Sequence, residues 1–346
     1  MKIAVATICK NEPPEFITRW SQSCAEADYR YILDTGSTDK TLHEIILNDT
    51  IKWSQQQFNP WRFDHARNAI WEHIPDDIDY VIWLDMDEVL QPGWRQAMEA
   101  MPDGVTRPRY KYIWSWNPDG SEGLVYGGDK ISARHGYYWK HPCHEVLKTD
   151  GDEVQNWVDG LEIHHHPDPT KSRSQYFPLL ELAVAEDPND DRNRFYLGRE
   201  YLFHGMKNKA TEQFTAYLEL GVWKPERAAA CRYMAEATGD KQHWLWRAVA
   251  EDCSRRENWY ALAQMYYLQQ NWEMLHYCTQ IGMLSKEKPL DYLCHSEAWG
   301  WQFWDYAALA AHHMGFSDQA FEYGSQAVAL NPGDVRLQGN MRWYKG

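Results

Sequence analysis

Long apolar runs, a surplus of basic residues and closely spaced cysteine pairs are all missing from this sequence of 346 residues. No apolar stretch approaches the roughly 18 residues that a membrane-spanning helix needs, so no membrane insertion is expected. The opening segment from Met1 to Ile8 is too short for a signal peptide. We therefore expect a soluble, cytoplasmic protein.

The charge and the cysteines narrow the class of protein further. A formal net charge of −15 argues against a general nucleic-acid surface, which needs a basic stripe, and against binding to an anionic membrane. The cysteines are odd in number, scattered and without a CxxC pair, as is typical of free thiols in a reducing compartment. They are Cys9, Cys24, Cys143, Cys231, Cys253, Cys278 and Cys294.

The most informative stretch that is present runs from Tyr80 to Leu90. Its first residues form an apolar run typical of a strand buried on both faces, and the run leads directly into Asp85 and Asp87. Ligands of open α/β sheets bind beyond the carboxyl ends of the strands, and alternate strand residues point the same way. Both carboxylates can therefore face one site, where they suit Mg²⁺ or Mn²⁺ and a phosphate. The alternative is that they merely cap the next helix.

The segments before this strand follow β-α-β logic. Residues 3–8 and 31–33 are short apolar runs, and each ends in a polar loop followed by an expected helix, to about residue 24 and over residues 40–47. A loop from Phe58 leads into another expected helix that carries Arg67 on its first turns. An arginine at this place can clamp phosphates, although a solvated surface arginine is the commoner case. The pattern predicts a mostly parallel sheet.

Residues 105–166 read as short strands and long loops. His144 and Glu145 lie in one such loop, and a strand from Leu161 runs into three consecutive histidines. Because side chains alternate along a strand, His165 should share a face with Leu161 and Ile163, and His164 and His166 should share the other. Beyond Pro169 the pattern is helical, with small and large residues repeating at intervals that resemble the tetratricopeptide pattern, most clearly in the first and last units. We predict domains at 1–168 and 169–346, and assign the repeats no chemistry.

Four segments together resemble the motifs of a family 2 glycosyltransferase with the GT-A fold, in their residues, order and spacing. They are Thr7–Glu12, Asp34–Asp39, Ala66–Asn68 and Trp83–Glu88, and the resemblance covers about residues 1–166. An attached helical repeat domain is a familiar variant in bacteria and their phages; a phage-encoded chain would work in the host cytoplasm. The resemblance implies a Rossmann-like, mostly parallel central sheet followed by an all-α repeat domain.

The resemblance also implies roles for individual residues. The first aspartate of the DxD motif is Asp85, and Asp87 corresponds to the direct metal ligand. A late histidine often completes the metal site; His165 is our choice and His166 the second choice, and Mn²⁺ or Mg²⁺ is the expected ion. The residues expected to bind the nucleotide sugar are Thr7, Asn11, Glu12, Asp34, Arg67, Asp85 and Met86.

Members of this family invert the anomeric centre, so a general base must take a proton from the acceptor. Glu145 is the best candidate, since it follows the β region where the family places that residue and stands beside His144. Asp129 and Glu122 are weaker candidates. The alternative is that Glu145 only anchors its loop.

Donor and acceptor are less well defined. The resemblance favours a UDP-linked donor. The acceptor is a protein, a saccharide or a modified DNA base, and residues near the expected acceptor side could contact it, although core or rim packing is their commoner use. They are Arg107, Arg109, Lys111, Trp114 and Trp116. The competing class is a catalytically inactive scaffold that binds a protein partner, and no oligomeric state is predicted.

Overall fold

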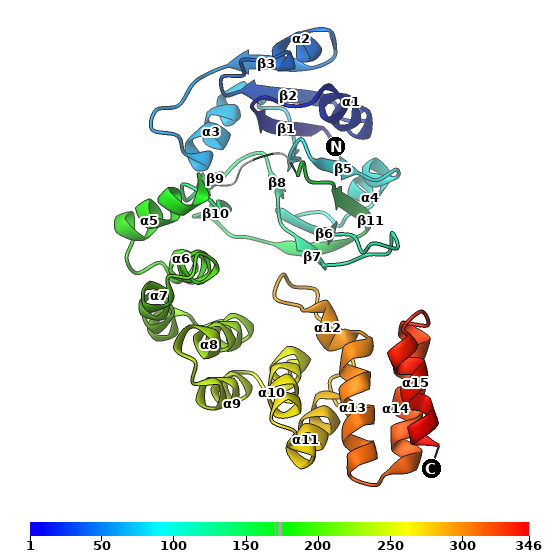
Figure 1. Cartoon of the computed structure of the whole chain (residues 1–346). Helices are drawn as coiled ribbons and strands as arrows, with labels where there is room; N and C mark the ends of the chain where they lie inside the picture. Colours follow the sequence, from blue (N-terminus) through cyan, green and yellow to red (C-terminus); the bar gives the residue numbers. More distant parts are fainter. Residues whose placement is uncertain (170, 172–174, 346) are drawn as a thin grey trace. The chain divides into compact units, whose positions relative to one another are not determined.

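The computed structural model describes residues 1–169, 171 and 175–345, which form two units (Figure 1). The first is Met1–Ala183 and the second is Val184–Gly346. Helix α5 (Tyr176–Glu186) begins in the first unit and ends in the second. The expected α/β fold followed by a tetratricopeptide-like helical region is confirmed, while the predicted boundary between residues 168 and 169 stays a prediction.

A five-stranded sheet with the order β3-β2-β1-β4-β8 forms the centre of the first unit. Its first four strands are parallel and β8 is antiparallel to β4. The strands are β1 (Ile3–Cys9), β2 (Tyr29–Asp34), β3 (Lys52–Gln55), β4 (Tyr80–Trp83) and β8 (Ile131–Ala133). Because parallel strands joined by helices end at the same edge, Cys9, Asp34 and the residues after Trp83 meet at one edge.

Helices cover both faces of this sheet. Alternation along β1 sends Ile3 and Val5 into one core, shared with α1 and α2, and sends Ala4 and Ala6 into another, shared with α3 and β9. The helices are α1 (Pro14–Ser23), α2 (Thr41–Ile46), α3 (Phe63–Ile70), the short η1 (Trp71–His73) and α4 (Trp94–Glu99). Burial on both faces explains why the strand sequences are continuous apolar runs.

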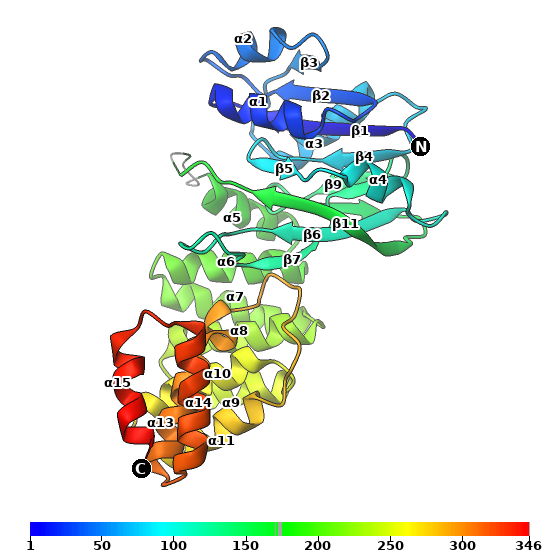
Figure 2. The same cartoon turned by 90° about the vertical axis from the view of Figure 1, so that its right-hand side faces the viewer.

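A second sheet with the order β5-β11-β6-β7 adjoins the first. In it β11 and β6 are parallel and the outer pairs are antiparallel. Its strands are β5 (Glu88–Leu90), β6 (Arg107–Ile113), β7 (Val125–Gly128) and β11 (Gln155–His165), and a separate hairpin consists of β9 (Tyr137–Lys140) and β10 (Val146–Thr149). Figure 2 shows β4 and β5 close to one another where the two sheets meet.

The expectation that Asp85 and Asp87 continue a strand is wrong. The strand ends at Trp83, and residues 84–87 form a turn that leads into β5. The Glu88 amide donates to the Asp85 carbonyl at 2.9 Å, which closes the turn. The carboxylates are thus placed by a tight connection between two sheets.

Helical hairpins stacked in chain order make up the second unit (Figure 1). They are α6 (Asp191–Phe203) with α7 (Lys207–Leu220), α8 (Lys224–Thr238) with α9 (Lys241–Glu251), α10 (Arg256–Leu268) with α11 (Trp272–Gly282), and α13 (Trp301–His313) with α14 (Ser317–Leu330). The short α12 (Ser296–Trp299) precedes the last hairpin and α15 (Val335–Tyr344) follows it. The middle region, whose sequence pattern is irregular, therefore also forms hairpins.

Small residues allow the two helices of a hairpin to approach. A Cβ on Gly198 of α6 would lie 2.8 Å from a ring atom of Phe214 of α7. Phe214 is fully buried, so the ring fills the space that the glycine leaves. Within the described residues, no helix has the length and apolar character to cross a bilayer.

Candidate active site

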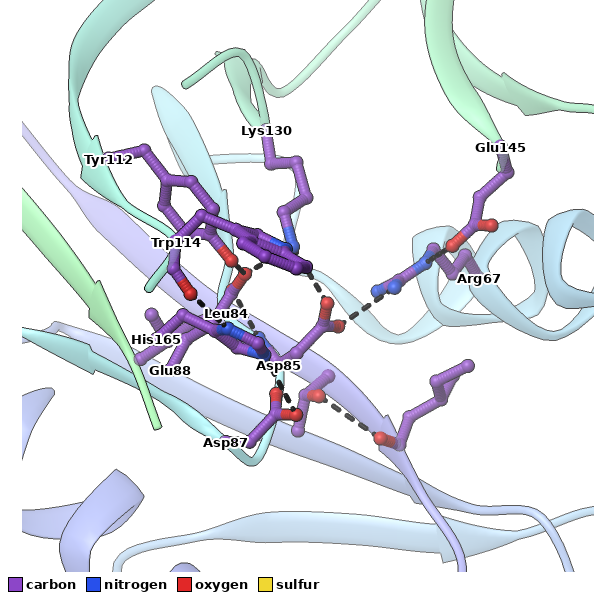
Figure 3. Close-up of polar contacts among 12 residues, drawn as sticks. Arg67, Leu84, Asp85, Asp87, Glu88, Tyr112, Trp114, Lys130, Glu145 and His165 are labelled. Atoms are coloured by element: carbon purple, nitrogen blue, oxygen red, sulfur yellow. Dashed lines mark hydrogen bonds and ion pairs between the residues drawn. The ribbon is translucent and has the colours of Figure 1, made fainter. Parts of the chain in front are cut away.

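The turn after β4 is held from several sides (Figure 3). Trp20 of α1 donates its indole N–H to the Leu84 carbonyl at 2.8 Å. The Asp85 amide donates to the Glu88 carboxylate at 2.8 Å. These contacts, together with the turn hydrogen bond, leave the Asp85 and Asp87 side chains in defined positions at the carboxyl edge of the central sheet.

Asp85 is bound by two cations. Arg67 Nη2 donates to Oδ1 at 2.8 Å and Lys130 Nζ donates to Oδ2 at 2.7 Å. Burial alone would raise the pKa of Asp85, but the two cations outweigh it and hold that pKa well below its usual range. Asp85 is therefore ionised and both of its oxygens are engaged.

Glu88 and Lys130 complete an inner network. Lys130 Nζ also donates to Glu88 Oε1 at 2.6 Å, and the Tyr112 hydroxyl donates to the same oxygen at 2.6 Å. Glu88 is 1% exposed, and its burial raises its pKa despite Lys130. Sequence reasoning missed the role of both. Glu88 stands directly after the DxD motif, whereas Lys130 precedes β8 and carries no local signal.

Asp87 faces a different partner. Its Oδ2 lies 3.3 Å from His165 Nε2, while His165 Nδ1 lies 2.8 Å from the Trp114 carbonyl oxygen. A carbonyl can only accept, so Nδ1 carries the hydrogen and Nε2 of the neutral ring directs a lone pair toward the carboxylate. Burial lowers the pKa of His165, but Asp87 and the carbonyl outweigh it and raise that pKa. Either a proton on His165 Nε2 or a cation bound between Nε2 and the Asp87 carboxylate would give both groups a partner.

The chemistry of this donor pair fits a divalent cation. A histidine whose second nitrogen donates to a backbone carbonyl is the usual arrangement of a metal-binding imidazole, and a carboxylate oxygen is a hard ligand suited to Mn²⁺ or Mg²⁺. No group of three or more histidine, cysteine, aspartate or glutamate side chains that could hold a metal occurs in the described part of the chain. Asp87 and His165 are therefore the residues that would hold such an ion.

The three histidines alternate as predicted. Leu161, Ile163 and His165 are buried, whereas His164 and His166 are half-buried on the other face. The His166 ring stacks on Trp116 with centroids 5.8 Å apart, and its amide donates to the Asp87 carbonyl at 2.7 Å. The structure therefore brings the His165 ring, and not the His166 ring, to the Asp87 carboxylate.

Arg67 also links Asp85 to Glu145. Arg67 Nε donates to Glu145 Oε1 at 2.6 Å, and the guanidinium lies 4.8 Å from the ring centroid of Trp139. The sequence placed Glu145 beside His144, but the ion pair that the structure provides is with Arg67. Arg67 is 4% exposed, and its buried Nη1 has no hydrogen-bond partner among the described residues.

The Asp34 carboxylate shapes its own loop. Its Oδ1 accepts from the amides of Gly36 and Ser37 and from the Gln55 side chain, each at 2.9 Å. The residue is fully buried; burial raises its pKa, but these hydrogen bonds outweigh the effect and lower it. The structure thus shows a loop-anchoring contact, and the predicted role of Asp34 in binding the nucleotide sugar stays a prediction.

The neighbouring predicted residues lie at the same edge of the sheet. Asn11 adopts a left-handed backbone with φ 53° and accepts the Thr38 amide at 2.8 Å. Glu12 is buried and paired with Lys171, while its Oε2 has no partner among the described residues; burial raises its pKa. Thr7 is also buried, and Met86 lies in the hydrophobic core.

The alternative base candidates and the basic cluster have structural partners elsewhere. Glu122 pairs with Lys111 at 2.6 Å, and Asp129 lies 3.5 Å from the Arg107 guanidinium. Arg109 donates to the carbonyls of Gly127 and Gly128 at 3.0 and 2.9 Å. These cations are thus engaged within the second sheet and its neighbouring loops.

No protein-family model and no curated protein matches this chain. Among solved structures it is similar to TarS of S. aureus, a glycosyltransferase, at 13% identity and a TM-score of 0.43, over 74% of this chain and 55% of TarS. YrrB, a tetratricopeptide-repeat protein, matches at 11% identity and a TM-score of 0.35, over 49% of this chain and 82% of YrrB.

A chain of the APC/C hetero-tetramer Cut9–Hcn1 matches at 12% identity and a TM-score of 0.37, over 49% of this chain but only 32% of the other. The chain therefore spans about a third of that protein and about half of TarS. At such TM-scores the likeness carries no argument about activity, so a function must be argued from the residues of the site.

Proposed function

We propose that the chain is an inverting, metal-dependent glycosyltransferase that moves a sugar from a nucleotide sugar, UDP-linked, to a nucleophile on an acceptor. The observation that carries the proposal is the pairing of Asp87 with His165 Nε2 at 3.3 Å, at the sheet edge where α/β folds bind ligands. Neighbouring Asp85 is held by Arg67 and Lys130, as a fixed charge beside that pair.

Asp87 and His165 would hold Mn²⁺ or Mg²⁺, which would neutralise the charge that develops on the departing diphosphate. Trp114 keeps the His165 ring in the tautomer that presents Nε2. Three carboxylates, those of Asp85, Glu88 and Glu145, share the side-chain cations Arg67 and Lys130, and the Asp87 carboxylate adds a fourth negative charge that faces His165. This negative balance favours binding of a divalent cation together with a phosphate ligand.

Arg67 and Glu145 would act on the two substrates. The unpartnered, buried Nη1 of Arg67 can donate to an oxygen of the donor. Glu145 is proposed to accept the proton of the acceptor, since its Oε1 is fixed by Arg67 and no described residue donates a hydrogen bond to its Oε2. Attack from the side opposite the diphosphate would invert the anomeric centre.

The acceptor is proposed to be a saccharide or a protein rather than a modified DNA base. Arg107, Arg109 and Lys111 would be the start of a basic stripe, but each is engaged by carbonyls or carboxylates of the same unit. DNA binding requires cations that can exchange counterions for phosphates. Helical repeats like those of the second unit commonly bind extended chains.

A screen of nucleotide sugars for metal-dependent release of nucleoside diphosphate tests this proposal. We expect release from at least one UDP-sugar in MnCl₂ or MgCl₂ and loss of release in EDTA. Asp87→Ala should abolish the release, whereas Asp76→Ala, which removes a carboxylate that is 93% exposed and lies outside the site, should not. If no donor is hydrolysed and nucleotides do not bind, the chain is better explained as an inactive scaffold for a protein partner.

A further inference from the structure

Arg19 of α1 makes no ion pair with a described residue, and the carboxylates that act on its charge, Asp87 and Glu15, lie farther away. Its guanidinium lies 4.4 Å from the ring centroid of Phe16, and its one hydrogen bond to a described residue, from Nη2 to the His166 carbonyl, is long at 3.5 Å. Its Nε is buried and has no acceptor, and no carboxylate of the described residues lies within ion-pair distance of it. A buried N–H without an acceptor costs about 1–3 kcal/mol.

Other arginines of the first unit are satisfied. Arg95, Arg107 and Arg134 each donate three or more hydrogen bonds to carbonyls or carboxylates. Within the described part of this unit, Arg19 and Arg67 are the arginines that keep a buried N–H without an acceptor. Arg199 and Arg255 of the helical unit also keep a buried Nε without an acceptor, so the position of Arg19 and Arg67 must distinguish them.

Arg67 contacts the acidic turn at a carboxylate, and Arg19 approaches it through the backbone of His166. Arg67 binds Asp85. Arg19 reaches the carbonyl of His166, whose amide binds the Asp87 carbonyl at 2.7 Å. Burial lowers the pKa of the Arg19 guanidinium and the Asp87 carboxylate opposes that shift, so the two charges act on one another. Arg67 and Arg19 therefore lie on the Asp85 side and the Asp87 side of the turn.

We propose that Arg19 is a second phosphate-binding arginine, which contacts the diphosphate of the nucleotide donor together with Arg67. This inference rests on the proposed function. Guanidinium groups match phosphate oxygens with paired donors, and a diphosphate offers oxygens to two separate cations. Arg19 would thus position the donor and the leaving group, and it would not contact the nucleoside.

The test compares ligands that share or lack the diphosphate. Binding of UDP and of inorganic diphosphate, each with MgCl₂, is measured by calorimetry, and binding of uridine by NMR titration, for wild type and Arg19→Gln. We expect Arg19→Gln to weaken UDP and inorganic diphosphate by about tenfold to a hundredfold, since a charge-assisted hydrogen bond is lost. Uridine binding should not change.

Arg95→Gln is the matched control, because it removes the same charge from α4, where Arg95 binds Asp28, Glu99 and the Met1 carbonyl. It should leave all three affinities unchanged. Arg19→Lys keeps the charge without the fork and should restore part of the UDP affinity; it also serves as the test variant if Arg19→Gln does not fold, with a smaller loss expected.

If an Arg19 variant binds UDP and inorganic diphosphate as tightly as wild type does, the inference is overturned and the proposed function stays intact. A parallel loss of uridine binding would also overturn it, because Arg19 would then act through the fold. If wild type binds neither UDP nor inorganic diphosphate, the proposed function fails and the role of Arg19 fails with it.

Discussion

In the helical unit, Arg227 donates twice to Glu251, at 2.7 and 2.8 Å, and Arg336 donates twice to Asp305, at 3.1 and 2.9 Å. In the α/β unit, Asp85 is instead shared by Arg67 and Lys130, and each cation reaches a further carboxylate. The helical unit also contains shared charges, since Arg247 contacts Glu251 as well and Arg255 contacts both Glu257 and Asp291, but each of these carboxylates faces an arginine. Among the described residues, Asp87 in the turn after β4 faces only an imidazole, and Arg67 keeps an N–H without an acceptor.

This difference distinguishes ion pairs that stabilise the fold from charged groups that could bind a ligand. A carboxylate that an arginine already neutralises between helices contributes to packing and needs no further cation. A surplus of carboxylates and an unmet donor at a sheet edge can be completed by a cation and a phosphate. Substitutions at the turn after β4 should therefore change ligand binding, whereas substitutions of paired charges in the helical unit should change only stability.

The largest effect is expected for Asp85→Asn. Loss of this charge leaves Arg67 and Lys130 buried without their shared partner, which should lower the free energy of unfolding by about 3 kcal/mol and abolish UDP binding. Asp291→Asn, which breaks the pair with Arg255 in the helical unit, should lower stability but leave UDP binding unchanged. Urea unfolding and calorimetry check both. Loss of UDP binding in Asp291→Asn would remove the distinction between the units.

Glu145→Gln should lower the rate of sugar transfer by about 100-fold or more, as expected for loss of a general base. The glutamine oxygen can still accept from Arg67 Nε, so UDP affinity should stay within about twofold. Steady-state kinetics and calorimetry measure the two quantities, with Glu122→Gln as the control. A transfer rate near that of wild type would show that Glu145 is not the general base and has only a structural role through its contact with Arg67.

Gly198→Ala tests the packing of the first hairpin. The added methyl group would overlap the Phe214 ring, and such overpacking costs about 1–3 kcal/mol in unfolding free energy. Gly333→Ala, where a Cβ meets no atom within 4 Å, should change stability little. Urea unfolding compares the two variants. Equal stabilities would show that α6 and α7 do not depend on a small residue at position 198.

The smallest effect is expected for Glu251→Gln, at about 1 kcal/mol, because the pair with Arg227 is partly exposed. Hydrogen bonds from Arg227 lower the pKa of Glu251. The stability that the pair contributes is therefore present above the unfolded-state pKa of about 4.3, and it is lost as the pH falls through the lower folded-state value.

Urea unfolding of wild type and Glu251→Gln at pH 7, 5 and 3.5 should show a difference that narrows at the lowest pH. UDP binding at pH 7 should be the same in both proteins. A difference that grows with acidity would contradict the sign of the pKa shift.

Local sequence patterns predicted the secondary-structure elements. They could not predict contacts between segments that lie far apart in the sequence. Apolar runs located β1, β2 and β4, and alternation placed His165 with Leu161 and Ile163 on the buried face. Lys130 meets Asp85 across 45 positions, and Arg67 meets Glu145 across 78. Such pairs depend on how β8 and the loop after β9 fold back onto the sheet, which no local pattern encodes.

The turn at residues 84–87 shows a second kind of limit. The same apolar run can precede either a continued strand or a turn. Here the turn is held by hydrogen bonds from the Asp85 amide to Glu88 and from the Trp20 indole to the Leu84 carbonyl. The roles assigned to Thr7, Asn11, Asp34 and Met86 stay predictions.

Pulsed electron paramagnetic resonance of Mn²⁺ bound with UDP tests most directly whether Asp87 and His165 hold a cation. The spectrum of wild type should show nitrogen coupling from one histidine. The coupling should be lost in His165→Gln and kept in His166→Gln. Absence of nitrogen coupling in wild type, or its survival in His165→Gln, would contradict the assignment.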